Sequence, residues 1–128
     1  MERRTLPGEA PEAVEEEFLE IVEKMRASDP SFNALVRRGL DRSALETRAD
    51  TDIVQALQSA SLKVLNRPAQ VAGVQFWTDA AVLSAEGIPS VLFGPAGSGA
   101  HAVEEWVDLA SVQTCVDIYL ETAMKFCG

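Results

Sequence analysis

A single histidine follows a glycine-rich stretch near the end of the chain. His101 is the one histidine in the 128 residues, and it comes shortly after Gly94, Gly97 and Gly99. A neutral imidazole can offer a ring nitrogen to a divalent metal ion. Glycines let a loop turn tightly through positive φ and point its amide groups at an anion or a carbonyl. A lone histidine is also compatible with an ordinary surface or hydrogen-bonded position, so both interpretations are open at this point.

The element expected to position this loop is a short apolar segment directly before it. Residues 90–93 read Ser-Val-Leu-Phe and lie between Pro89 and Gly94. Such a bounded apolar run predicts a buried strand of a parallel sheet. In open α/β sheets, ligands collect beyond the carboxyl ends of the strands. We therefore expect a functional site where the chain leaves this strand and reaches His101.

Several short motifs around the loop carry a family resemblance. They are Thr78-Asp79-Ala80, Gly87-Ile88-Pro89, Phe93-Gly94-Pro95, and Ala100-His101 followed by Glu105 and Val107. In order and spacing these motifs resemble the C-terminal end of the M20-type metallopeptidases and deacylases, a family that includes acetylornithine deacetylases. Near the start, residues 4–9 (Arg-Thr-Leu-Pro-Gly-Glu) resemble the strand-to-helix turn in the lid domain of that family. The resemblance covers nearly the whole chain, is weak between Ser28 and Asp50, and says little about the substrate.

The resemblance implies an α/β fold made of two partial domains. Residues 1–45 would be half of an inserted, ferredoxin-like lid domain that serves dimerisation. Residues 46–128 would be the distal, C-terminal part of a zinc-exopeptidase-like catalytic domain. The implied partners are a second copy of the protein, as a homodimer or by self-association, and a small substrate.

The resemblance also implies a metal-dependent amide hydrolase that removes an acyl group from an N-acyl amino acid or cleaves a small peptide. In such an enzyme a metal ion polarises the scissile carbonyl, and a carboxylate takes a proton from the metal-bound water. His101 would be a ligand of Zn²⁺ or Co²⁺, with two ions in the intact enzyme. The residues implied around the cleft are, for the substrate, Gly94, Gly97, Ser98 and Gly99 and, in supporting positions, Thr78, Asp79 and Glu105.

Most of the catalytic apparatus of that family is expected outside these residues. The resemblance places the first metal-binding histidine, a bridging aspartate and the Glu-Glu pair with the general base upstream. A zinc site needs three or four protein ligands. We therefore expect no catalytic residue, no tight metal binding and no activity in this chain alone. The alternative is a non-catalytic remnant or interaction module with the same partial fold.

Length and charge narrow the classes of protein further. At 128 residues with 47% apolar content, the chain is long enough for an ordinary domain with a hydrophobic core. A net charge of −9 argues against a nucleic acid or an anionic membrane as partner, because either would need a basic surface. No apolar run of about 18 residues and no signal-like leader is present, so we expect a cytoplasmic protein. Cys115 and Cys127 lie too far apart along one predicted helix to form a disulfide, and both are expected to be at least half-buried thiols.

Apolar residues recur at helical spacing in several segments, with capping and breaking residues at their ends. The pattern predicts helices from Pro11 to the Asp29-Pro30 pair, from a cap at Asp50 or Thr51 to Asn66, over residues 77–85 with Thr78 as a possible cap, and after a cap at Asp108. The first helix is expected to bury Val14, Phe18, Ile21, Val22 and Met25. The last is expected to bury Leu109, Val112, Val116, Tyr119, Leu120 and Ala123. Glutamates at the start of the first helix indicate a solvated face rather than a cation site, because consecutive side chains splay around the axis.

The segments between the helices are less sharply patterned. Residues 32–40 are a candidate strand, and residues 70–76 are a candidate strand or extended loop. The polar stretch from Asp41 to Asp50 has no apolar period and is expected to link two structural units. The main basic cluster consists of Arg37, Arg38, Arg42 and Arg48. These are either surface arginines or include one that meets a substrate carboxylate.

Overall fold

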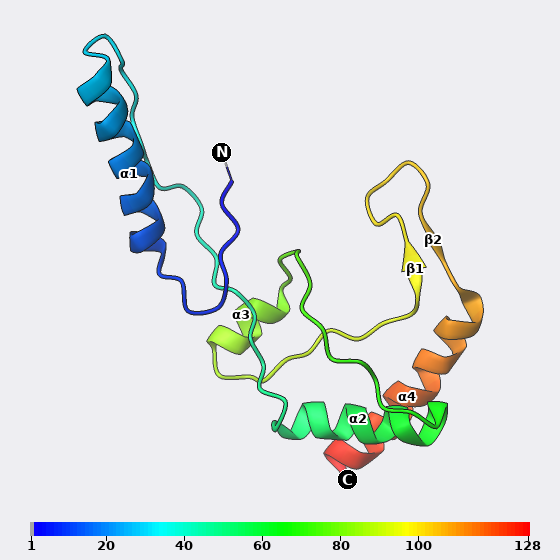
Figure 1. Ribbon diagram of the computed structural model, residues 1–128. Coiled ribbons are helices and arrows are strands. Elements are labelled where there is room, and N and C mark those ends of the chain that lie inside the picture. The colour runs from blue at the N-terminus through cyan, green and yellow to red at the C-terminus, as the bar shows by residue number, and fades with distance from the viewer. Residues whose placement is uncertain (1) are drawn as a thin grey trace. The chain divides into compact units, whose positions relative to one another are not determined.

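The computed structural model describes residues 2–128, in which the chain forms four helices and a two-stranded sheet. The elements are α1 (Pro11–Ser28), α2 (Asp52–Leu65), α3 (Ala80–Ala85), β1 (Gly97–Ser98), β2 (Trp106–Val107) and α4 (Leu109–Cys127), as labelled in Figure 1. The chain divides into two compact units, Met1–Glu46 and Thr47–Gly128. The first unit contains α1, and the second contains the other elements.

Helix α1 confirms the predicted first helix at both ends. Proline occupies its first turn, where the missing N–H costs no helical hydrogen bond. Glu12 in the first turn and Arg26 in the last turn complement the helix dipole. The amide of Asp29 donates to the carbonyl of Met25 at 2.9 Å, and Pro30 then prevents the helix from continuing. The ends of α1 therefore follow from local sequence signals.

The apolar face of α1 is narrower than the sequence predicts. Val14, Phe18 and Val22 are half-buried. Ile21 and Met25, which we expected on the same face, are 54% and 45% exposed. A single return segment covers only a thin stripe of the helix, so the flanks of the apolar face stay open to solvent.

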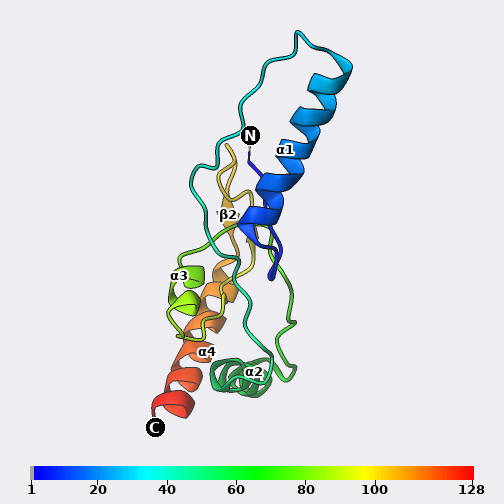
Figure 2. The ribbon, with the colours of Figure 1, turned by 90° about the vertical axis from the view of Figure 1, so that its left-hand side faces the viewer.

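The return segment after α1 is not the predicted strand. Residues 32–40 run alongside the helix in both views of Figures 1 and 2 but have no regular secondary structure. The side chains of residues 32–37 alternate between half-buried and exposed, as in a strand, and those of residues 38–40 are all exposed. A strand also needs a neighbour with which to exchange backbone hydrogen bonds. Two side-chain interactions hold the segment instead: Arg26 donates to the carbonyl of Ala34 at 2.7 Å, and Arg38 pairs with Glu12 at 2.6 Å.

The second unit has its core between α2 and α4, which cross in Figure 1 and lie side by side in Figure 2. Ile118 of α4 and Ser61 of α2 are fully buried, and Ile118 is the larger of the two. The other buried residues of the two helices are Val54, Ala56, Ala60, Cys115 and Thr122. Most of these side chains are small, so the two helix backbones can approach each other. As predicted, α2 begins after Thr51 and ends at Asn66, which adopts the left-handed conformation with φ 56°.

The predicted buried face of α4 is wrong. Cys115, Ile118 and Thr122 face α2. The stripe that we expected in the core is turned outward, with exposed fractions of 54% for Val116 and 58% for Leu120. This helix is apolar on two sides, and periodicity alone selects the more hydrophobic stripe rather than the one that meets the small side chains of α2.

The predicted parallel strand at residues 90–93 is also absent from the described part of the chain. Ser90, Val91 and Phe93 are half-buried, but the segment has no strand partner. The sheet that forms is antiparallel, with Gly97 opposite Val107 and Ser98 opposite Trp106. A parallel strand needs neighbours from distant parts of a chain, whereas this small sheet closes within eleven residues. The fold is thus mixed helix and sheet, compatible with part of an α/β enzyme.

Two further features of the second unit bear on the sequence predictions. Residues 70–76 have no regular structure, so they match the extended-loop alternative. Both cysteines are free; Cys115 is buried, whereas Cys127, expected to be at least half-buried, is exposed at the C-terminal end of α4. Within residues 2–128, no helix combines the length and hydrophobicity that crossing a bilayer requires.

Candidate functional site

The glycine-rich segment and His101 together form a β-hairpin. Strands β1 and β2 pair in antiparallel register, and residues 99–105 connect them (Figure 1, yellow to orange). Gly99 has φ +80°, and a Cβ atom there would lie 2.0 Å from the backbone oxygen of Glu104. At Gly97 a Cβ atom would lie 2.5 Å from the backbone oxygen of Trp106. Both distances are far below van der Waals contact, so the hairpin closes only because these two positions lack side chains.

This geometry corrects the expected role of the glycines in the loop. Gly99 has the positive φ that we predicted, whereas Gly94 and Gly97 do not. Gly97 belongs to β1, and a Cβ atom at Gly94 would meet no atom within 4 Å. Ser98, also in β1, is exposed and lies opposite Trp106. Gly97 and Gly99 therefore let two backbones approach each other, and a role in holding substrate is a separate proposal.

His101 lies in the connection of the hairpin, with its side chain exposed. Its φ is +64°, a left-handed conformation that non-glycine residues adopt rarely. The amide of Ala102 donates to the carbonyl of Gly99 at 2.7 Å and closes a tight turn around His101. The turn thus holds the backbone of His101 in a conformation that non-glycine residues rarely adopt, and its imidazole is exposed to solvent.

Two acidic side chains lie near His101 in sequence. Glu104 and Glu105 are exposed in the same connection as His101. In the described residues 2–128, no group of three or more His, Cys, Asp or Glu side chains is arranged to hold a metal ion. Since zinc needs three or four protein ligands, His101 could supply one ligand to a site completed by other residues.

The base of the hairpin is bonded to the start of α4 through residues that our sequence analysis did not single out as functional. The amide of Asp108 donates to the carbonyl of Ala96 at 2.8 Å, and the amide of Ala96 donates to Ser111 Oγ at 2.9 Å. Asp108 also caps the helix, because its Oδ1 accepts from the amide of Ser111 at 2.6 Å. The predicted cap at Asp108 is confirmed. The Asp-x-x-Ser spacing at a helix start is the signal that could have indicated this contact.

A second contact holds the segment that leads into the hairpin. The hydroxyl of Tyr119 donates to the carbonyl of Phe93 at 2.5 Å. The two rings meet edge to face, with centroids 5.7 Å apart and an interplanar angle of 88°. Burial, and secondarily the nearby Cys115 thiol, raises the pKa of Tyr119 above its ordinary value. The tyrosine therefore stays a neutral donor over the physiological range.

Thr78 and Asp79 lie at the start of α3, away from the hairpin in sequence. The amide of Ala80 donates to Thr78 Oγ1 at 3.2 Å, so Thr78 supports the helix start as predicted. The helix itself begins at Ala80, later than expected, and Asp79 is exposed. In this unit α2 packs closely against α4, and β1 packs against β2. Helix α3 does not pack closely against the hairpin that carries His101.

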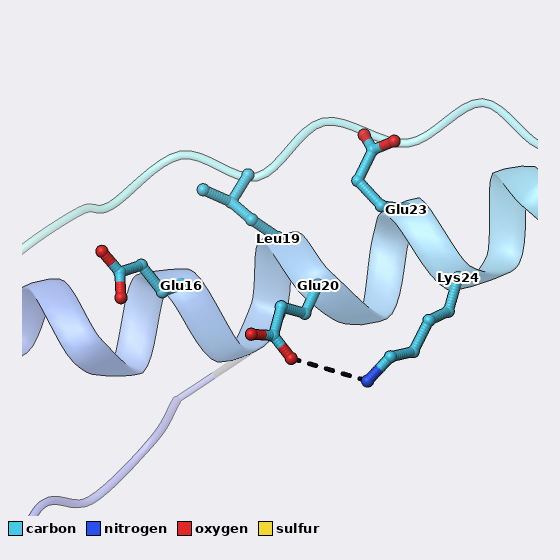
Figure 3. Close-up of a pocket in the computed structure, with 5 residues that line it drawn as sticks. All are labelled: Glu16, Leu19, Glu20, Glu23 and Lys24. Carbon is cyan, nitrogen blue, oxygen red and sulfur yellow. Dashed lines mark hydrogen bonds and ion pairs between the residues drawn. The ribbon is translucent and has the colours of Figure 1, made fainter.

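Helix α1 carries a shallow hollow lined mostly by ionisable side chains. Figure 3 shows it lined by Glu16, Leu19, Glu20, Glu23 and Lys24. Lys24 Nζ lies 3.5 Å from Glu20 Oε2, one turn away on the same helix. Pairs of this kind are typical of a solvated helix face.

Comparison with known proteins decides the family of the chain. The sequence model of Peptidase family M20/M25/M40 matches residues 14–125, a span that includes the hairpin and His101. The chain belongs to this family. It is also 30% identical, over 129 aligned residues, to an acetylornithine deacetylase from Myxococcus xanthus. That alignment covers 100% of the chain and 32% of the relative, so the chain spans about a third of the length of this curated relative. The family resemblance drawn from the motifs is confirmed.

Proposed function

We propose that this chain is the C-terminal segment of a metal-dependent amide hydrolase that removes an acyl group from an N-acyl amino acid. The observation that carries the proposal is the family match across residues 14–125. The similarity to an acetylornithine deacetylase along 100% of the chain supports deacylation over peptide cleavage. In the whole protein, residues 1–45 belong to the lid domain and residues 46–128 to the catalytic domain.

His101 is the residue of this chain that takes part in metal binding in the whole protein. Its exposure and its place in a tight turn support this role, because an exposed imidazole can enter a site made by other segments. The remaining ligands and the general base come from outside these 128 residues. The metal is Zn²⁺ or Co²⁺, as two ions in the complete site.

The hairpin also contributes to substrate binding in this proposal. The backbone amides of Gly94, Gly97 and Gly99 and the exposed hydroxyl of Ser98 are polar groups near His101 in sequence that can meet a substrate carboxylate or carbonyl. Thr78, Asp79 and Glu105 support the site from further away. The protein acts as a homodimer.

A second candidate is a non-catalytic remnant that binds a partner protein. The outward face of α4 favours it, because several large apolar side chains there are about half exposed, including those of Val116, Leu120 and Met124. In a deacylase the same face would be covered by the rest of the catalytic domain. The two candidates therefore differ in what covers α4 and in whether His101 meets a metal.

The test is hydrolysis of N-acetylornithine and N-acetylmethionine by the whole protein and by the isolated 128-residue chain, with added Zn²⁺ or Co²⁺. The proposal predicts turnover by the whole protein and none by the isolated chain, which lacks the other ligands and the base. Turnover by the isolated chain that is lost in His101→Ala would show that the chain holds a complete site. No turnover of any N-acyl amino acid by the whole protein would favour the remnant.

A further inference from the structure

The backbone carbonyl and amide of Ala96 both form hydrogen bonds that join the His101 hairpin to the start of α4. The carbonyl of Ala96 accepts from the amide of Asp108 at 2.8 Å, and the amide of Ala96 donates to Ser111 Oγ at 2.9 Å. The Ser111 hydroxyl donates its own proton to the carbonyl of Asp108 at 2.7 Å. The serine hydroxyl is therefore fully used, and it joins the segment entering β1 to the first turn of the helix.

The two ends of the hairpin differ in how they are attached to α4. Strand β2 ends at Val107 and continues directly into Asp108, so the covalent chain fixes this side. Strand β1 begins at Gly97, eleven residues before the helix cap, and reaches α4 through the bonds of Ala96. A hairpin with two residues in each strand has little stability of its own. Its orientation therefore depends on the attachment at its base.

Helix α4 is suited to serve as the fixed support. It has 19 residues and packs against α2 through Ile118, which is 1% exposed. The capping bond from the amide of Ser111 to Asp108 Oδ1, at 2.6 Å, uses the serine backbone and not its hydroxyl. Loss of the hydroxyl would therefore remove one of the two bonds of Ala96 and loosen the hairpin, while the bond from the Asp108 amide and the helix cap stay in place.

We propose that Ser111 is a positioning residue for His101, whose hydroxyl fixes the entering strand of the hairpin to the first turn of α4. The functional meaning of this contact rests on the proposed role of His101 at a metal site. Ser111 itself touches neither substrate nor metal in this proposal. It restricts where the imidazole lies before the other ligands engage it, which preorganises the site.

The test follows the motion of His101 in the isolated chain by nuclear magnetic resonance. His101 is the one histidine in the sequence, so its imidazole signals are assigned without ambiguity. In Ser111→Ala we expect the heteronuclear NOE of the His101 amide to fall to the level of a flexible loop. The exchange rate of the Ala96 amide should rise about tenfold, because a hydrogen bond of ordinary strength is lost. Ser111→Thr keeps the hydroxyl and should restore both values.

Thr114→Ala is the matched control, because the Thr114 hydroxyl donates to the carbonyl of Ala110 within α4 at 2.9 Å. Unchanged His101 motion and Ala96 exchange in Ser111→Ala, relative to this control, would overturn the proposal. If Ser111→Ala loses helical circular dichroism, Ser111→Cys replaces it, since a thiol keeps the size and is a weak acceptor. These readouts need no metal and no turnover. The proposal can therefore fail while the deacylase function stands, and the reverse also holds.

Discussion

Replacing Gly99 by alanine should open the His101 hairpin. A Cβ atom at this position would lie 2.0 Å from the backbone oxygen of Glu104, so the two backbones must separate by roughly 1.4 Å to regain van der Waals contact. The residue also has φ +80°, which an L-residue adopts at a cost of about 1–2 kcal/mol. Together we expect a loss of about 2–4 kcal/mol from local stability. This exceeds what two-residue strands contribute, so the hairpin should be mostly open.

The assay is the set of cross-strand NOEs that join Gly97 to Val107 and Ser98 to Trp106. These should disappear in Gly99→Ala, while the signals of α2 and α4 keep their positions. Gly73→Ala is the control, because a Cβ atom there would meet no atom within 4 Å and its φ is not positive. That substitution should be neutral or slightly stabilising. Full retention of the cross-strand NOEs in Gly99→Ala would refute the close backbone approach and the reasoning built on it.

Three further predictions concern ionisation and association. Tyr119, the one tyrosine, should titrate above the ordinary tyrosine pKa in the absorbance of tyrosinate. Its contribution to stability is present below the ordinary pKa and is lost as the pH rises through the raised value. Tyr119 is 48% exposed, and an ordinary pKa in the folded chain would contradict even this partial desolvation. The pKa of Glu12 should be lowered, chiefly by its bond to Arg38, so this pair stabilises the fold above the ordinary glutamate pKa, and that contribution is lost as the pH falls through the lowered value. In Arg38→Gln, a side-chain titration should find the pKa of Glu12 moved toward the ordinary value, and an unchanged pKa would contradict the pairing. The isolated chain should self-associate through the exposed face of α4, with sedimentation showing weaker association in Leu120→Lys than in Gln70→Lys, an exposed position outside α4; a monomer at micromolar concentration in the unsubstituted chain would speak against it.

The helices could be predicted from the sequence because their signals are local. Pro11 and Pro30 set the ends of α1, Asn66 ends α2 in a left-handed conformation, and Asp108 caps α4. Each of these effects depends on residues within one turn of the helix end. The same locality explains why short contiguous motifs around Thr78 and His101 were enough to indicate the family.

The strands and the buried face of α4 could not be predicted in the same way. An apolar run such as residues 90–93 becomes a strand only beside a partner, and the partner is a property of the whole fold. The face of α4 was assigned from hydrophobicity, whereas the contact surface is set by the small side chains of α2, Ala56, Ala60 and Ser61. The hairpin strands are two residues long, too short for a period of alternation. The anchoring role of Ser111 arises from a contact with Ala96, 15 residues away in sequence.

The most direct test of the central claim is the metal content and kcat of a His101 variant of the whole protein. His101→Asn is the sharper substitution, because asparagine tolerates the left-handed φ of +64° and removes only the imidazole. His101→Ala also removes the imidazole, but alanine does not tolerate this φ, so the difference between the two variants measures the effect of backbone strain. On protein shown to be folded, both variants should bind less zinc per subunit and lose at least about 100-fold in kcat. Full zinc occupancy with near wild-type kcat in both variants would contradict the claim that His101 is a metal ligand.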